Sequence, residues 1–187
     1  AYALDPAGRE NWEAIEEFPP YETAISQGET LWETPFANGK GYADCFPDGP
    51  AMAAPYPRWD RARRMVVTLP LALNDCRQSN GEQPLQYETG PIIGLLAYIA
   101  YASRGQITRV EIPDDDPRAL AAYEQGKQFY FARRGQLNFS CAHCHFANSG
   151  NALRTEILSP AYGHTTHWPV YRSDWGDIGT LHRRFSG

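Results

Sequence analysis

The sequence has little lysine, little methionine and no long apolar run. Lys40 and Lys127 are its only lysines, so arginine supplies the other fifteen of its 17 basic residues. The longest apolar stretch, residues 91–102, falls short of the roughly 20 residues that cross a bilayer, so we expect no membrane span. The net charge of −5 argues against nucleic-acid binding. The N-terminal residues lack a charged and then apolar leader, which indicates a mature or an engineered form.

Glycine and proline, by contrast, are abundant, with 16 and 15 residues among 187. This composition predicts long loops around few regular elements and disfavours a Rossmann-type or barrel enzyme. The hydrophobic fraction of 42% and the charged fraction of 21% are ordinary for a globular protein, so a disordered chain and a coiled coil are both disfavoured. The length suits one or two small domains.

Cys141, Cys144 and His145 form a CxxCH motif, the attachment signature of c-type haem. Two thiols three residues apart can reach the two vinyl groups on one porphyrin edge, and the following histidine then lies over the iron. The motif therefore predicts one covalently attached haem c, with His145 as an iron ligand.

Two other uses of these residues remain alternatives. A zinc site could take Cys141 and Cys144, with a histidine such as His164 or His167 completing the ligand set. The sequence offers no second CxxC and no HxxxH for that purpose. A redox-active dithiol is less favoured, because no βαβ pattern surrounds the motif.

Cys45 and Cys76 have no other cysteine nearby in the sequence. Haem c is attached outside the bacterial cytoplasm, where disulfides persist. We therefore expect a Cys45–Cys76 disulfide, closing a loop of about 30 residues and stabilising the fold by roughly 3 kcal/mol in the chain-entropy model. Two free, buried thiols are the alternative.

The segment leading into the haem motif resembles an earlier one, which indicates an internal repeat. When Gly28 is set against Gly126, Trp32 aligns with Tyr130. Each segment is predicted to form a helix, followed by a loop that runs into a cysteine. In cytochromes c this helix crosses the last helix of the domain at a glycine, beside an aromatic ring.

The first copy of the repeat has lost its haem motif. Tyr42 and Phe46 stand where the first cysteine and the histidine would be. We therefore predict that this half binds no haem in the usual way. The Cys45–Cys76 disulfide is predicted to stabilise it in place of the haem.

Residues 91–103 are predicted to be the closing helix of the first half, started by Pro91 and stopped by Gly105. Any other buried amphipathic helix would have a similar sequence. Residues 110–117, which include an acidic run, are predicted to link the halves. No apolar helical pattern follows His145, so we expect the second domain to lack its C-terminal part.

The predicted fold is mainly α, with two tandem class I cytochrome c-like domains and long loops. The haem-free domain, with an N-terminal extension, is predicted to occupy residues 1–110. The haem-binding domain is predicted to occupy residues 118–187.

Several stretches together resemble the SoxA family, the larger subunit of the SoxAX cytochrome of bacterial sulfur oxidation. The resemblance extends over roughly 150 residues and is far more specific than CxxCH alone. The stretches that carry it are residues 133–145, 158–172 and 178–185, with further similarity in residues 38–49 and 73–82.

This resemblance implies an enzyme, an L-cysteine S-thiosulfotransferase that depends on haem. Its catalytic subunit joins thiosulfate oxidatively to a cysteine of the SoxYZ carrier protein, and the electrons pass to haem. The implied partner is a small SoxX-type cytochrome c in a periplasmic heterodimer. Tyr42 and Phe46 match the single-haem subgroup, in which the counterparts of Cys45 and Cys76 are expected to form a disulfide.

The resemblance also implies an active-site cysteine just after Gly187, beyond the sequence. This cysteine would also bind the haem iron and could be a persulfide. Arg184 matches the active-site arginine of the family, and a guanidinium suits a thiosulfate dianion. Arg183 is a less clear match.

The sixth iron ligand has internal alternatives as well. The only methionines, Met52 and Met65, belong to the first half, so a His/Met pair within the haem domain is disfavoured. The remaining internal alternatives are His164, His167 and His182.

Two competing functions follow from the same motif. A plain electron-transfer cytochrome would show a haem of higher potential and no dependence on thiosulfate. A haem peroxidase would need a vacant iron site and generally a second working haem, which the replacements at Tyr42 and Phe46 disfavour.

Overall fold

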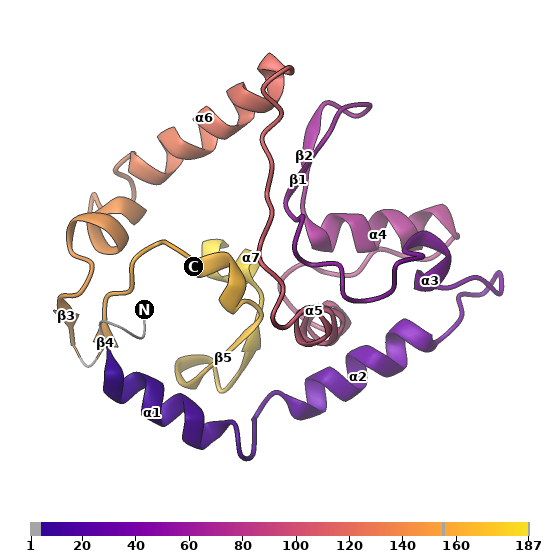
Figure 1. Cartoon of the computed structure of the whole chain (residues 1–187), viewed down its shortest axis with the longest axis horizontal. Coiled ribbons are helices and arrows are strands. Elements are labelled where there is room, and N and C mark those ends of the chain that lie inside the picture. Colours follow the sequence, from indigo (N-terminus) through magenta and orange to yellow (C-terminus); the bar gives the residue numbers. More distant parts are fainter. Residues whose placement is uncertain (1–4, 155, 187) are drawn as a thin grey trace. The chain divides into compact units, whose positions relative to one another are not determined.

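The computed structural model describes residues 5–154 and 156–186 and is mainly helical, as predicted (Figure 1). The chain divides into two compact units, which are treated separately below. The CxxCH unit comprises Ala1–Pro19 and Ile112–His164, and the disulfide unit comprises Pro20–Glu111 and Thr165–Gly187. Within the described residues, no helix has the length and apolar character needed to cross a bilayer.

The units differ from the predicted domains at both ends of the chain. The first 19 residues group with the CxxCH unit, and residues 165–187 group with the disulfide unit. Side-chain contacts explain the second grouping, because the buried Thr180 donates a hydrogen bond to the Tyr87 carbonyl oxygen (2.8 Å). The tandem domains over residues 1–110 and 118–187 stay a prediction.

Helices and short hairpins build both units. The disulfide unit contains α2 (Glu22–Glu33), α3 (Tyr42–Cys45), β1 (Arg58–Asp60), β2 (Met65–Val67), α4 (Leu69–Ser79), α5 (Pro91–Ala102), β5 (Val170–Arg172), the 3-10 turn η3 (Ser173–Trp175), β6 (Asp177–Gly179) and α7 (Leu181–Ser186). The CxxCH unit contains α1 (Pro6–Ile15), α6 (Pro117–Phe131), the π-helical turn η1 (His143–Ala147), β3 (Ala152–Leu153) and β4 (Glu156–Ile157). The 3-10 turn η2 (His164–His167) follows where the chain passes from one unit to the other. The strands pair as antiparallel hairpins, β1 with β2, β3 with β4 and β5 with β6.

Proline explains where several of these helices begin. A proline lies in the first turn of α1, α4, α5 and α6, where its missing N–H breaks no helical hydrogen bond. Capping side chains add to this signal: Thr68 accepts from the Leu71 N–H before α4, and Asp116 accepts from the Arg118 N–H before α6. The predicted closing helix is confirmed as α5, which starts at Pro91.

Two glycines allow α2 and α5 to cross closely. A Cβ atom added at Gly28 would lie 1.9 Å from the Gly94 carbonyl oxygen, and one at Gly94 would lie 3.1 Å from the Gly28 nitrogen. Figure 1 shows α5 almost end-on where α2 passes it. The aromatic rings of Trp32 and Tyr98 flank the crossing, with ring centres 6.3 Å apart. The predicted glycine crossing is therefore present in this half.

Aromatic rings fill the core at the positions where the repeat predicts a lost haem motif. Tyr42 is fully buried, stacks on Trp32 with ring centres 5.5 Å apart, and meets Phe36 edge-on at 5.0 Å. Phe46 stacks on the same indole at 6.0 Å. Burial raises the pKa of Tyr42, and the Arg77 guanidinium, which donates to its hydroxyl oxygen (3.3 Å), partly opposes that rise.

The Cys45–Cys76 disulfide is present and joins α3 to α4, with the two Cα atoms 6.0 Å apart. Cys76 is buried against the same core as Tyr42. The alternative of two free thiols is therefore wrong for this structure. The bridge closes a loop between residues 31 positions apart, so it restricts the unfolded chain considerably.

Substituting Gly28 with alanine should destabilise the disulfide unit by about 3 kcal/mol or more, because the new methyl group would overlap the α5 backbone. Gln27→Ala, at an exposed position on the same helix, is the matched control. Urea unfolding of the haem-loaded protein measures both changes. Equal stability of the two variants would contradict the close crossing.

Replacing both Cys45 and Cys76 with serine should lower the free energy of unfolding by about 3 kcal/mol, since the unfolded chain regains its loop freedom. Denaturant unfolding with and without a thiol reductant provides the internal control. Reductant should lower the stability of the wild-type protein to that of the double variant and leave the variant unchanged. A reductant effect of the same size on both proteins would contradict the assignment.

Candidate functional site

A single helical turn carries the CxxCH residues. The chain is helical at Cys141 and continues through η1, which contains Cys144 and His145. Residues three and four positions apart share a helix face, so the two thiols and the imidazole lie on one side of this turn. Both thiols are half-buried, and neither is in a disulfide. Two thiols so placed suit attachment to one porphyrin edge.

The His145 ring is oriented by the backbone of the loop that follows. Its Nδ1 atom lies 2.8 Å from the Ser159 carbonyl oxygen, and a carbonyl oxygen can only accept a hydrogen bond. The proton is therefore on Nδ1, and Nε2 is left to bind a metal. Histidines that bind metals commonly donate their other N–H in this way, which fixes both the tautomer and the ring orientation.

His164 packs beside His145 and not opposite to it. The two ring centres are 4.4 Å apart and nearly perpendicular, and Ser159 Oγ lies 2.9 Å from His164 Nε2. Two imidazoles on opposite sides of one iron would have ring centres roughly 6 Å apart, given metal–nitrogen bonds of about 2 Å. This geometry disfavours His164 as the sixth ligand.

The apolar side chains of the CxxCH unit are largely exposed. Its buried hydrophobic residues within the described ranges are Ala119 and Ala142. Large side chains near the motif are solvent-exposed, including Leu137 (76%), Phe146 (72%) and Tyr162 (96%). A porphyrin ring is large and apolar, so a haem attached here would cover such side chains.

A buried polar atom also lies close to the motif. The Tyr130 hydroxyl has no hydrogen-bond partner among the described residues. Burial raises the pKa of Tyr130. A buried hydroxyl generally has a partner, and haem carries propionate oxygens that could serve as one. The residues around the CxxCH turn therefore fit a haem group.

The zinc alternative requires several metal ligands to converge. In residues 5–154 and 156–186, no three or more His, Cys, Asp or Glu side chains are arranged to hold a metal ion. Attachment of haem requires only the two thiols and one histidine that the turn presents.

Arg183 and Arg184 lie side by side in the sequence of α7 but differ in their contacts. The Arg183 guanidinium sits over the Trp175 ring (4.4 Å) and lies 3.9 Å from the Asp177 carboxylate. Arg184 is exposed, and its backbone N–H donates to the Thr180 carbonyl oxygen (3.2 Å). Of these two arginines, Arg184 is therefore the one whose guanidinium is accessible to an anion.

The predicted site residues fall into both units. Cys141, Cys144 and His145 lie in the CxxCH unit, whereas Arg184 lies in the disulfide unit with the bridge. His167 and His182 belong to the disulfide unit as well, and burial lowers the pKa of each. The expected cysteine just after Gly187 lies outside the described residues.

Two groups beside the motif were not predicted from the sequence: the Ser159 carbonyl oxygen and the buried Tyr130 hydroxyl. Ser159 contributes its carbonyl oxygen to His145 from 14 positions away. Any residue type can supply a backbone carbonyl, so no sequence signal marks this role. Tyr130 was aligned with Trp32 through the repeat, but only the structure shows that its hydroxyl is buried.

Comparison with known proteins supports the cytochrome character of the first half. Residues 27–107 match the family model described as SoxA/TsdA, cytochrome c domain. This match covers the α2–α5 crossing and the disulfide. It lies entirely outside the CxxCH motif, so the half without that motif is itself cytochrome c-like.

Whole-chain similarity points to one group of proteins. The chain is 79% identical over 186 residues to the L-cysteine S-thiosulfotransferase subunit SoxA of Allochromatium vinosum, covering 100% of this chain and 66% of that protein. It is 53% identical to the same subunit of Chlorobaculum tepidum, with 64% of that protein covered. The chain thus spans slightly less than two thirds of the length of these curated relatives.

A solved structure agrees with the sequence comparison. The crystal structure of SoxXA from P. pantotrophus superposes with a TM-score of 0.77 at 29% identity, covering 89% of this chain and 63% of that chain.

Replacing Cys141 and Cys144 together with alanine should abolish covalent haem attachment, because both thioether bonds are lost. The variant is expressed with a haem-attachment system and its intact mass is measured. The mass should be lower than that of wild type by one haem, about 0.6 kDa, in addition to the two sulfur atoms removed by the substitutions. The matched control is the Cys45→Ala, Cys76→Ala double variant, which should keep the haem mass. Retention of the haem mass without Cys141 and Cys144 would overturn this attachment site.

Proposed function

Because this chain belongs to the SoxA family, we propose that it acts as the catalytic subunit of an L-cysteine S-thiosulfotransferase. The reaction joins thiosulfate oxidatively to a cysteine of a SoxYZ-type carrier protein. The observation that carries the proposal is the 79% identity to the Allochromatium vinosum SoxA subunit over the whole of this chain. The CxxCH turn and the exposed Arg184 supply residues suited to such chemistry.

We propose one haem c per chain, attached to Cys141 and Cys144 with His145 as an iron ligand. When bound, haem supplies a one-electron acceptor. The Ser159 carbonyl holds the His145 ring with Nε2 free. Tyr42 and Phe46 support a haem-free first half, because their rings occupy the core in place of a motif cysteine and histidine.

The proposed reaction forms one S–S bond and releases one proton and two electrons. The S–H bond of the carrier cysteine breaks, and an S–S bond forms between that sulfur and the outer sulfur of thiosulfate. The products are a Cys–S–S–SO₃⁻ group, one proton and two electrons, and a bound haem would accept these electrons one at a time. We also propose covalent catalysis through sulfur, by a cysteine expected just after Gly187.

Arg184 is proposed to bind the anionic sulfonate end of the substrate. Its guanidinium is exposed, whereas that of Arg183 is engaged with Trp175 and Asp177. A planar guanidinium can donate two parallel hydrogen bonds to an oxyanion and stabilise charge that develops during transfer. It also favours the thiolate form of a nearby cysteine.

The proposed partner is a small SoxX-type cytochrome c subunit in a heterodimer. This rests on the solved relative, which is a SoxXA assembly. The SoxYZ-type carrier would be a transient substrate partner, and the periplasm is the proposed location, in keeping with the disulfide.

Arg184→Ala should lower the rate of thiosulfate transfer by about 100-fold, since the charge that holds the sulfonate is lost. Arg184→Lys should recover part of this loss, because a lysine keeps the charge but not the planar fork. The assay is mass spectrometry of the carrier cysteine, which gains one S₂O₃ group, using the full-length, haem-loaded protein.

Arg109→Ala is the matched control, because Arg109 is an exposed arginine in the same unit. Its transfer rate should equal that of wild type. A rate for Arg184→Ala within twofold of wild type would remove Arg184 from the mechanism. If wild-type protein modifies no carrier while its haem still exchanges electrons, an electron-transfer cytochrome is the better account.

A further inference from the structure

Residues 180–186 are anchored to the loop between α4 and α5, residues 80–90. Thr180 is 1% exposed, and its hydroxyl donates to the Tyr87 carbonyl oxygen (2.8 Å). The same hydroxyl accepts from the Arg183 N–H (3.2 Å), three residues along the chain. Thr180 therefore caps the start of α7 and fixes that start to Tyr87.

Two more contacts join the same loop to α7. The Tyr87 ring stacks on the His182 imidazole, with ring centres 5.0 Å apart and planes 20° apart. The Ser186 hydroxyl donates to a Glu88 carboxylate oxygen (2.5 Å). Tyr87 and Glu88 thus hold the cap, the second residue and the last residue of a six-residue helix. So short a helix has no stability of its own, and its position depends on such contacts.

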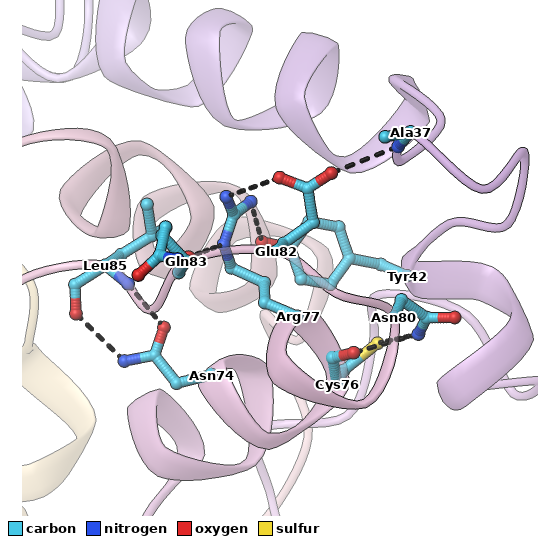
Figure 2. A network of polar contacts seen from close by, with 9 residues as sticks. All are labelled: Ala37, Tyr42, Asn74, Cys76, Arg77, Asn80, Glu82, Gln83 and Leu85. Atoms are coloured by element: carbon cyan, nitrogen blue, oxygen red, sulfur yellow. Dashed lines mark hydrogen bonds and ion pairs between the residues drawn. The ribbon is translucent and has the colours of Figure 1, made fainter.

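The loop is in turn fixed to α4. Asn74, which is 2% exposed, pairs with the Leu85 backbone through two hydrogen bonds of 2.9 and 2.8 Å. Arg77 donates to the Gln83 carbonyl oxygen (2.7 Å) and pairs with Glu82 (3.4 Å). Figure 2 shows these contacts converging on the loop from one helix, the helix that also carries Cys76.

We infer that the loop of residues 80–90 positions α7 for sulfur transfer, with Tyr87 and Glu88 as positioning residues. This inference rests on the proposed function, because Arg184 on α7 gains its role from it. The haem-free half then has a structural role. It forms a rigid base, which the disulfide stabilises, and this base sets the orientation of α7 and so of Arg184.

Tyr87→Ala tests this inference in the full-length, haem-loaded protein. Loss of the ring removes the stack on His182, and a small misplacement of a reacting group can cost about 100-fold in rate. We expect kcat for carrier modification to fall by 10- to 100-fold, with little change in the KM for the carrier. Tyr87→Phe keeps the stack and should recover most of the rate.

Tyr101→Ala is the matched control. Tyr101 is a half-exposed tyrosine on α5 of the same unit, with an arginine over its ring. Its variant should keep wild-type kcat. Hydrogen exchange provides a readout that does not depend on activity: Tyr87→Ala should speed exchange of the amides in residues 181–186, and Tyr101→Ala should leave them unchanged.

The outcomes separate this inference from the proposed function. If wild-type protein transfers no thiosulfate, the proposed function fails, whatever the exchange data show. If wild-type protein is active, and Tyr87→Ala loosens α7 but keeps full kcat, the positioning role is wrong. Full protection of α7 in Tyr87→Ala would also overturn it. If Tyr87→Ala does not fold, Glu88→Ala tests the second anchor in the same assays, with the same expected fall in kcat.

Discussion

The close crossing of α2 and α5 is the contact on which the rest of the disulfide unit depends. With glycine at positions 28 and 94, the two backbones touch directly. That approach brings Trp32 over Tyr42 and so fixes α3, from which Cys45 reaches Cys76 on α4. A larger residue at the crossing would move each of these elements in turn, because a close-packed interior transmits such strain.

The two units obtain their cores in different ways. The disulfide unit buries a continuous cluster of aromatic and aliphatic side chains and closes it with a covalent bridge. The CxxCH unit leaves large apolar side chains exposed and one tyrosine hydroxyl unpaired among the described residues. This contrast accords with a repeat in which one copy keeps a haem and the other replaces it with packed rings and a disulfide. In our proposal, the half without the CxxCH motif serves as a base for α7.

Local sequence signals predicted much of this structure. Proline at the first position predicted α5, and the glycines predicted the crossing. The spacing of Cys141, Cys144 and His145 predicts a haem site, which stays a prediction. The grouping of the last residues with the first half was not predicted. It rests on contacts such as Thr180 with Tyr87, which join positions 93 residues apart. Hydrogen bonds to backbone carbonyls leave no pattern in the sequence, so such contacts are visible only in the fold.

In the proposed function, this chain couples the oxidation of thiosulfate to the modification of a carrier cysteine. The most direct measurement is the ratio of haem reduced to carrier modified, in an oxygen-free mixture of the oxidised holoprotein, the carrier and thiosulfate. Absorbance reports haem reduction, and mass spectrometry reports the S₂O₃ group on the carrier. We expect two haem equivalents to be reduced for each cysteine modified. Haem reduction by thiosulfate without any modified carrier would contradict the proposed function.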